Sequence, residues 1–365
     1  MKVTIVSPYA LPERGANSFR VHSLGDFLKR NNVETEIFSP ERNVPETDIV
    51  KRYSGIFDLM KKVLKSKSNI VIYTSPPITH AIFAGFAAKL SGKKFFLDIR
   101  DPWPKVSEVL GIYKKNSPKL LLYKLIEQIS YLLAEKIFVV TEGIKKHVEQ
   151  KGAGPKIVLA PNGTLPDFKF LPKEREKIRN KIGLSKNNLL FVYSGSFVGW
   201  DTKKIVEAFV HYPKNTKLLL LLPTPEESKK DYLLLRAFAE KTLKERVLVL
   251  DIKGFLPRQI TAYFSAADVG IITVPDGLNY CIRAKTYDYL ASGLYLLAKG
   301  PSNGSLKNLF KKYDVGTYFE SWNSFKNFGE QKAKFSYSQR CIRERIAKKN
   351  FLREQTNEII FKEIS

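Results

Sequence analysis

The chain has 365 residues, of which 44% are hydrophobic and 27% charged, a composition typical of a globular protein and not of a disordered or low-complexity one. This length favours two domains over one. The longest apolar runs fall far short of the ~18 residues of a membrane span, and the first residues read as a strand and not as a signal peptide, so we expect a cytoplasmic protein. The two cysteines, Cys281 and Cys341, lack the spacing of a disulfide framework or a zinc site.

The sequence is strongly basic, with 61 Lys and Arg against 36 Asp and Glu and a formal net charge of +25. Such a charge favours an anionic partner: a nucleic acid, an acidic membrane surface or a phosphorylated substrate. The charge is spread along the chain, and no recognised module interleaves aromatic residues with Lys and Arg. We therefore expect no nucleic-acid partner.

In the first half, short β-branched or aliphatic runs alternate with helical stretches, which predicts a parallel sheet covered by helices. We expect strands at residues 3–7, 34–38, 70–74, 95–98, 136–140 and 157–159. Apolar periodicity predicts one helix around residues 19–28 and another around 120–132.

Pro161-Asn162-Gly163 is a strong turn signal, and a polar helix at 172–182 leads from it into a second series of the same kind. Strands are expected there at residues 189–193, 218–222, 247–250, 269–273 and 295–298, and helices at 337–364. The sequence thus predicts an α/β protein with two Rossmann-like, doubly wound parallel-sheet domains, residues 1–165 and 166–338. Residues 339–365 are expected to pack back toward the first domain. Such domains bind ligands at the carboxyl ends of their strands, and two facing crevices would form a shared cleft.

Three loops of the first half are candidates for such a site. Arg14 and Gly15 lead into the helix that carries Arg20, and backbone N–H groups at a helix start suit a phosphate or a reacting hydroxyl. A simple strand–helix connection explains this loop equally well. Ser75-Pro76-Pro77 ends the third strand.

The fourth strand ends in Asp98-Ile99-Arg100-Asp101-Pro102-Trp103-Pro104. Burying Asp98, Arg100 and Asp101 without partners would be costly. They therefore belong either to a ligand site or to a local Arg–Asp network that holds the loop.

In the second half, Gly195 and Ser196 follow a strand and precede a helix with Lys203 and Lys204. Small residues let the backbone approach a diphosphate, and a lysine can neutralise it. The segment matches neither the G-x-G-x-x-G fingerprint nor the P-loop pattern, which argues against an ATPase.

The most informative stretch is residues 279–293, read as a loop followed by a helix. Lys285 and Asp288 share one face of that helix. A basic residue near the helix start can hold donor phosphates, and the acid one turn on can accept hydrogen bonds from ribose hydroxyls. A surface salt bridge is the simpler alternative.

Together these segments resemble family 4 of the retaining glycosyltransferases, which have the GT-B fold of two Rossmann-like domains. The shared elements occur in order along most of the chain, and they are closest to the branch that builds cell-surface polysaccharides. They are Ser-Pro-Pro at 75–77, D-x-R-D-x-W-P at 98–104, P-N-G at 161–163, Gly254 followed by a Y-x-x-A-D-like element at 264–268, and a K-x-x-E-Y-x-A-x-G-like element at 285–293.

The resemblance implies transfer of a sugar from a nucleotide-sugar donor, UDP-sugar before GDP-sugar, to a glycan or polyprenyl-linked acceptor with retention of configuration. It implies no metal or other cofactor. The implied catalytic residues are Arg283, Lys285 and Asp98. The implied donor-binding residues are Gly195, Ser196, Lys203, Lys204, Gly254, Phe255, Tyr280 and Asp288. The implied acceptor-binding residues, in the first domain, are Arg14, Gly15, Arg20, Ser75, Arg100 and Asp101.

The chain departs from the family pattern at two places: Tyr280 stands where the first glutamate of an E-x7-E pair is expected, and Asp288 replaces the second. Two other functions stay open. A nucleotide-sugar 2-epimerase would need more carboxylates and histidines for proton transfer. A basic nucleic-acid- or membrane-binding module without catalysis would fit the charge, and residues 51–65 have the spacing of a helix lying on an anionic membrane.

Overall fold

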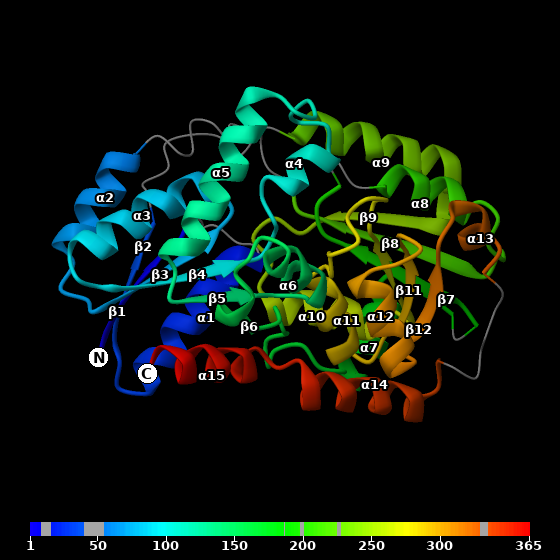
Figure 1. Ribbon diagram of the computed structural model, residues 1–365. Coiled ribbons are helices and arrows are strands. Elements are labelled where there is room, and N and C mark those ends of the chain that lie inside the picture. Colours follow the sequence, from blue (N-terminus) through cyan, green and yellow to red (C-terminus); the bar gives the residue numbers. More distant parts are fainter. Residues whose placement is uncertain (9–15, 40–54, 186, 198–200, 225–227, 329–334) are drawn as a thin grey trace. The chain divides into compact units, whose positions relative to one another are not determined.

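The computed structural model describes residues 1–8, 16–39, 55–185, 187–197, 201–224, 228–328 and 335–365. The chain divides into two compact units, one made of Met1–Asn162 with Arg353–Ser365 and the other of Gly163–Leu352. Figure 1 gives the element labels used below. Among the described residues, no helix combines the length and the hydropathy that a membrane span requires.

The first unit contains a six-stranded parallel sheet in the order β2-β1-β3-β4-β5-β6. The strands are β1 (Lys2–Val6), β2 (Glu34–Phe38), β3 (Ile70–Ser75), β4 (Lys94–Ile99), β5 (Lys136–Val139) and β6 (Ile157–Leu159). The helices are α1 (Ala16–Arg30), α2 (Ile56–Lys65), α3 (Ile78–Leu90), α4 (Lys105–Val109), α5 (Pro118–Leu133), α6 (Glu142–Glu149) and α15 (Arg353–Ile364), with a short 3-10 helix at Gly154–Lys156. Every residue of β3 is buried, as expected of a parallel strand with helices on both faces.

The second unit repeats this plan with the strand order β12-β11-β10-β7-β8-β9, again all parallel. The strands are β7 (Leu189–Ser194), β8 (Thr216–Leu222), β9 (Val247–Asp251), β10 (Val269–Thr273), β11 (Tyr295–Lys299) and β12 (Gly316–Phe319). The helices are α7 (Pro172–Lys181), α8 (Thr202–Phe209), α9 (Lys229–Leu243), α10 (Pro257–Ala266), α11 (Lys285–Ala291), α12 (Ser305–Tyr313), α13 (Trp322–Lys326) and α14 (Tyr337–Asn350), with a 3-10 helix at Lys244–Arg246. The predicted pair of doubly wound sheets is confirmed.

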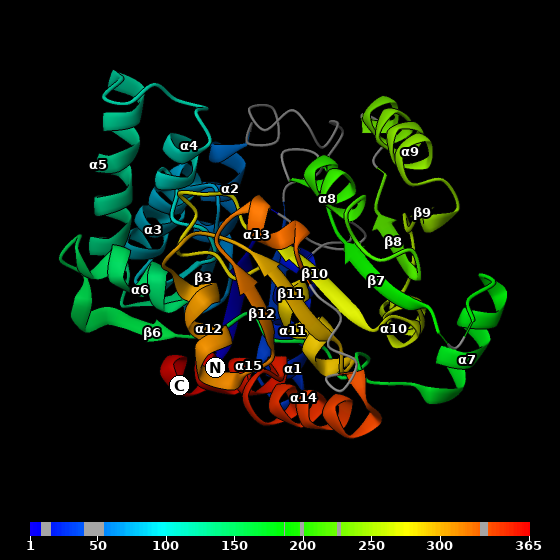
Figure 2. The same ribbon diagram turned by 90° about the vertical axis from the view of Figure 1, so that its right-hand side faces the viewer.

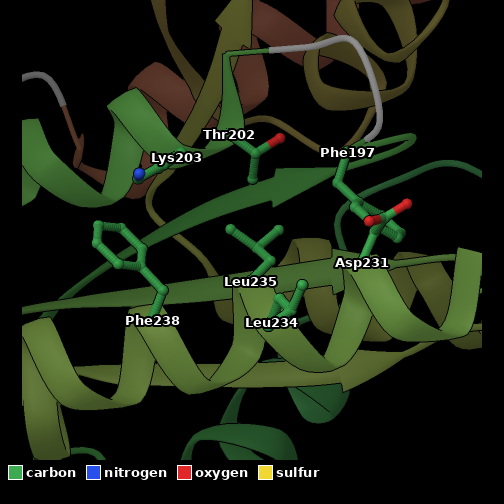
Figure 3. A pocket seen from close by; sticks show the side chains of 7 residues that line it. All are labelled: Phe197, Thr202, Lys203, Asp231, Leu234, Leu235 and Phe238. Carbon is green, nitrogen blue, oxygen red and sulfur yellow. The ribbon is translucent and has the colours of Figure 1, made fainter.

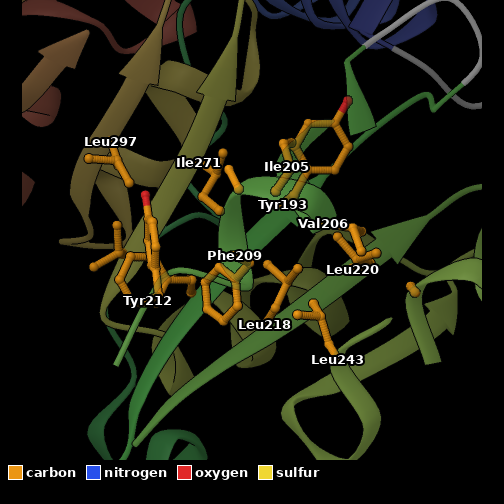
Figure 4. Packing of buried hydrophobic residues seen from close by; sticks show 14 of the residues in the cluster. Tyr193, Ile205, Val206, Phe209, Tyr212, Leu218, Leu220, Leu243, Ile271 and Leu297 are labelled. Carbon is orange, nitrogen blue, oxygen red and sulfur yellow. The ribbon is translucent and has the colours of Figure 1, made fainter. Parts of the chain in front are cut away.

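The core of the second unit is rich in aromatic and branched side chains. Figure 4 shows Phe209 and Tyr212 packed against leucines of β8 and against Ile271 of β10. The Phe209 and Tyr212 ring centroids lie 4.8 Å apart. This packing fixes the order of β8, β7 and β10, and thereby the loops at their carboxyl ends.

A buried cluster of charge joins α7, α14 and the start of β10. The Asp268 carboxylate is only 4% exposed and accepts hydrogen bonds from Arg175 at 2.6 Å, Arg340 at 2.8 Å and Arg179 at 3.3 Å. The backbone N–H of Leu190, in β7, donates to the same carboxylate at 2.9 Å. Asp268 is therefore a structural hub of the second unit.

The two C-terminal helices belong to different units. α14 belongs to the second unit, because Arg340 donates a hydrogen bond to Asp268 and Arg343 donates one to the Gly293 carbonyl at 3.0 Å. α15 joins the first unit, where Ile360 and Ile364 enter the core and the Asn357 side chain donates to the Ser23 carbonyl of α1 at 3.0 Å. The sequence predicts residues 339–365 as one segment that packs toward the first domain, whereas the contacts divide it between the two units.

The chain thus passes between the units twice, at 162–163 and at 352–353. Thr164, just after the first crossing, pairs with Leu352, just before the second, in an isolated parallel β-bridge. The Thr164 backbone N–H donates to the Phe351 carbonyl at 2.7 Å.

Candidate functional site

The strand order of the second unit reverses between β7 and β10, the position where doubly wound sheets bind ligands. Gly195 follows β7 directly, with φ of +138°. A Cβ atom built on Gly195 would lie 3.3 Å from Nη2 of Arg283. Gly195 and Arg283, predicted from separate segments, therefore lie together.

Arg283 is held against the end of β7 by Tyr193. Its Nη1 donates to the Tyr193 hydroxyl at 3.1 Å, and its guanidinium carbon lies 5.6 Å from the Tyr193 ring centroid. The Tyr193 hydroxyl in turn donates to the Ser196 carbonyl at 2.6 Å. Tyr193 was not predicted as a site residue, and it orients both the arginine and the loop.

Lys285 and Asp288 form the predicted pair on α11, with Nζ 3.4 Å from Oδ2. Oδ1 of Asp288 accepts a hydrogen bond from the Thr164 hydroxyl at 2.8 Å, and Asp288 is only 7% exposed. The Lys285 ammonium lies 5.5 Å from the Phe168 ring and 5.6 Å from the Phe264 ring. The pair is therefore partly desolvated, and its electrostatic interactions are stronger than those of a salt bridge at the surface. Thr164 was not predicted.

Tyr289 also fixes the position of the loop after β7, because its hydroxyl accepts a hydrogen bond from the backbone N–H of Ser194 at 2.7 Å. The ring is fully buried, and it needs the glycine at position 270, because a Cβ there would lie 2.6 Å from Tyr289 Cδ2. Burial raises the pKa of the Tyr289 hydroxyl well above its ordinary value, so the hydroxyl stays protonated.

We expect Gly270→Ala to lower the free energy of unfolding by about 1–3 kcal/mol, because the added Cβ would overlap the fully buried Tyr289 ring. The added methyl should also weaken nucleotide binding, since it displaces the hydroxyl that holds Ser194. Urea unfolding monitored by circular dichroism measures the first effect. Gly154→Ala is the control, because its Cβ would meet only Glu149 Cγ at 4.0 Å. Equal stability of the two variants would contradict this account.

The other predicted donor-binding residues lie elsewhere in the second unit. Lys203 lies over the Phe238 ring of α9 at 5.0 Å, and Lys204 pairs with Asp201 at 3.1 Å. Figure 3 shows Lys203 lining a pocket between α8 and α9 with Thr202, Leu235 and Phe238. Lys203 thus lies against α9 and Lys204 against Asp201.

Gly254, at φ +81°, makes the turn after β9, and Phe255 next to it stacks on Tyr263 with ring centroids 6.2 Å apart. Tyr280, which stands in place of the family's glutamate, is 6% exposed. Its loop is tied to the start of α12 through the Asn279 carbonyl, which accepts the Ser305 N–H at 2.8 Å.

In the first unit, Asp98 and Arg20 are paired with each other. Nε and Nη2 of Arg20 donate to the two carboxylate oxygens at 2.9 and 2.7 Å, and the side chains are 5% and 2% exposed. Arg20 also donates to the Ala160 and Pro161 carbonyls, both at 3.1 Å. This is the structural Arg–Asp network considered as the alternative for the β4 loop, with Arg20 as the partner instead of Arg100. It joins α1, β4 and the end of β6.

Ser75, Arg100 and Asp101 do gather at the carboxyl ends of β3 and β4. The Arg100 N–H donates to the Ser75 carbonyl at 3.2 Å, and both side chains are buried. The peptide bonds before Pro76, Pro77 and Pro104 are cis. Arg14 and Gly15 lie outside the described residues.

Burial raises the pKa of Asp101, and the Arg100 charge only partly opposes this. A raised carboxyl pKa favours the protonated form in the folded state. The destabilisation is therefore absent below the unfolded pKa of about 3.9, grows as pH rises toward the folded pKa, and is fully present above it. We therefore expect Asp101→Asn to raise the melting temperature near pH 7 and to change it little near pH 4. Differential scanning fluorimetry across this range measures the effect. A pH-independent difference would show that the carboxylate carries no desolvation cost.

Within the described residues, no group of three or more His, Cys, Asp and Glu side chains suits a metal ion. The groups that gather near Gly195 and on α11 are instead two cations and one carboxylate. Such a set can hold a diphosphate by charge and a hydroxyl by hydrogen bonds.

No family model matches the chain, and no curated protein does. Solved structures are similar over nearly the whole chain. Sucrose-phosphate synthase from Thermosynechococcus elongatus superposes with a TM-score of 0.74 at 14% identity, and the alignment covers 99% of this chain and 97% of the synthase chain. Anabaena HepE in complex with UDP has a TM-score of 0.73 at 13% identity, covering 100% and 99%. The lipopolysaccharide outer core galactosyltransferase WaaB has a TM-score of 0.66 at 14% identity, covering all of both chains.

These likenesses define the class of fold: two Rossmann-like units of the GT-B type. At identities of 13–14% these similarities establish the fold and not the function. What this chain does has to be argued from its site.

Proposed function

We propose that this chain is a glycosyltransferase that moves a sugar from a nucleotide-sugar donor to an acceptor with retention of configuration. The observation that carries the proposal is the meeting of Gly195 and Arg283 at the switch point of a GT-B-type sheet, together with the partly desolvated Lys285–Asp288 pair. HepE has been solved with UDP, with UDP and glucose, and with UDP-glucose. This favours a UDP-sugar over a GDP-sugar for the present chain, with a hexosyl or N-acetylhexosaminyl group transferred.

In this proposal the donor diphosphate binds against the backbone of Gly195, with Arg283 and Lys285 as its counter-charges. Both cations stabilise the negative charge that grows on the departing nucleotide diphosphate, which lowers the barrier because they are already in place. Asp288, once its bond to Thr164 is exchanged, accepts from the ribose hydroxyls. Since arginine and lysine supply the charge, the mechanism needs no metal ion.

The acceptor would be a glycan or a polyprenyl-linked sugar, and it would bind to the first unit near Ser75, Arg100 and Asp101. A desolvated carboxylate such as Asp101 suits a site that orients sugar hydroxyls. We include in the proposal that the enzyme works at the cytoplasmic face of an anionic membrane. No specific observation favours the 2-epimerase or a non-catalytic binding module.

A thermal-shift screen against UDP, GDP, ADP and dTDP tests the donor proposal, because a ligand that binds the folded state raises the melting temperature. UDP should give the largest shift. Lys285→Ala and Asp288→Ala should each remove most of it, and Lys311→Ala, an exposed lysine of α12, should leave it unchanged. If no nucleotide changes the melting temperature, the proposal fails. Release of a free isomerised sugar nucleotide without an acceptor would instead favour the epimerase.

A further inference from the structure

The outward face of α5 is apolar. Leu121, Leu122 and Leu125 are 53%, 54% and 52% exposed, and Leu132 is 75% exposed. These positions lie on one side of the helix, because residues three, four and seven apart share a face. The inward side, with Leu120 and Tyr131, is buried. α5 therefore has a second apolar face that the packing of its own unit does not use.

The elements next to α5 in the chain and in space also expose apolar side chains. The loop before α5 adds Leu110 and Ile112, which are 49% and 50% exposed, and α3 ends in Leu90, which is 76% exposed. Figure 2 shows α5 on the outside of the first unit with α3 next to it. We call the set Leu110, Ile112, Leu121, Leu122, Leu125 and Leu132 the α5 surface.

Around the N-terminal part of the α5 surface the charges are mainly positive. Between Glu108 and Glu127 the sequence holds Lys114, Lys115, Lys119 and Lys124 and no acidic residue. Glu127 does not offset them at the surface, because it is 1% exposed and hydrogen-bonded to Tyr131 and His147. Glu108 pairs with Lys124, and Glu135 pairs with Lys89 beyond the far end of α5. The net charge bordering Leu121, Leu122 and Leu125 is therefore positive.

This charge pattern distinguishes between two possible binding partners of the α5 surface, a second copy of the chain and an anionic membrane. A second copy of the chain related by a two-fold axis would bring the same surface against itself and set lysines against lysines. A bilayer with anionic lipids takes up the leucines at the headgroup–acyl boundary and the lysines at the phosphates. An anionic membrane therefore fits both features of the α5 surface.

Residues 51–65 are predicted from the sequence either as a helix on an anionic membrane or as a core helix with a solvated basic back, and in the structure the apolar side of α2 is mostly buried. Leu59 and Val63 of α2 are 4% and 0% exposed, since they pack inward beside α3. Of the apolar side chains of α2, Phe57 is 85% and Leu64 is 43% exposed. Residues 51–54 lie outside the described residues.

We propose that the α5 surface is a docking site for an anionic membrane, with Leu121, Leu122 and Leu125 as its centre and Lys114 and Lys115 on its border. This inference deepens the membrane part of the proposed function and does not depend on the donor chemistry of the second unit.

Co-sedimentation of the full chain with lipid vesicles tests the proposal. The wild type should bind vesicles of phosphatidylcholine mixed with phosphatidylglycerol and bind pure phosphatidylcholine far more weakly. Leu121→Ser with Leu125→Ser should lower the partition coefficient on mixed vesicles by roughly tenfold or more. Lys114→Glu with Lys115→Glu should lower it as well and reduce its dependence on salt.

Matched controls come from α9 in the second unit. Leu233→Ser with Leu234→Ser changes leucines that are 54% and 61% exposed, and Lys229→Glu with Lys230→Glu changes two exposed lysines. Both double variants should bind like the wild type. Circular dichroism melting of all variants checks that they fold, and because every substituted side chain is exposed, we expect unchanged unfolding.

The proposal is overturned if the α5 and α9 variants bind vesicles equally, or if the wild type does not distinguish anionic from neutral lipid. A dimer in sedimentation equilibrium that Leu121→Ser with Leu125→Ser disrupts would also overturn it, since the surface would then belong to a second copy. Vesicle binding with the expected pattern supports it whether or not UDP raises the melting temperature, so the two proposals fail separately.

Discussion

Replacing Arg283 by alanine is expected to lower the rate constant of sugar transfer by about a hundredfold to a thousandfold, the usual cost of removing one preorganised charge from a transition state. The side chain is half-buried and held on Tyr193 at 3.1 Å, so little reorganisation is needed when charge develops on the donor diphosphate. Release of nucleoside diphosphate from a UDP-sugar, measured at saturating donor, gives the rate.

The lysine variant sharpens this test. Arg283→Lys keeps the charge but loses the planar fork that bonds Tyr193 and stacks near its ring, so it should remain strongly impaired. Arg236→Ala, which removes an exposed arginine paired with Glu240 on α9, is the control and should be fully active. Wild-type turnover in Arg283→Ala would remove this residue from the mechanism.

The largest expected effect on stability comes from Asp268. Asp268→Ala should lower the free energy of unfolding by about 3–5 kcal/mol, because it leaves the buried charges of Arg340 and Arg179 without their carboxylate. Burial lowers the pKa of Arg340 to about 10 even with this partner present. Equilibrium unfolding in urea at neutral pH measures the loss, and Glu240→Ala on the surface of α9 should cost almost nothing.

The same cluster predicts a pH dependence. Burial by itself raises the pKa of Asp268, but Arg175, Arg340 and Arg179 outweigh it and hold the pKa below its ordinary value. A depressed carboxyl pKa stabilises the folded state above the unfolded pKa of about 3.9, and this stabilisation is lost as pH falls through the folded pKa. The difference between wild type and Asp268→Asn should therefore be largest near neutral pH and shrink in acid. A difference that stays constant into acid would show that the carboxylate is not held ionised by the arginines.

Much of the fold was accessible from the sequence, because buried parallel strands are nearly continuous apolar runs between turn signals. Eleven of the twelve strands were predicted within one or two residues of their observed bounds. The exception, β12, has the sequence Gly-Thr-Tyr-Phe and so lacks the run of aliphatic residues that made even the three-residue β6 predictable.

Pairings within the site could be predicted from spacing only where the residues are close in sequence; Gly195 and Arg283 were connected by the family resemblance instead. Lys285 and Asp288 are three positions apart, and their pairing follows from helix geometry. The partners of Asp98 and Asp288 are Arg20 and Thr164, which are 78 and 124 positions away. No spacing rule connects such residues, because the fold alone brings them together. The resemblance implies a catalytic role for Asp98, and its pairing with Arg20 could not be predicted from the sequence.

The return of α15 to the first unit bears on how the protein forms during translation. The second unit is one uninterrupted segment, Gly163–Leu352, and it can close its core as soon as that segment has left the ribosome. The first unit is synthesised earlier but still lacks Ile360 and Ile364, which are buried among Val3, Ile72 and other core residues. The unit that is made first is therefore completed last.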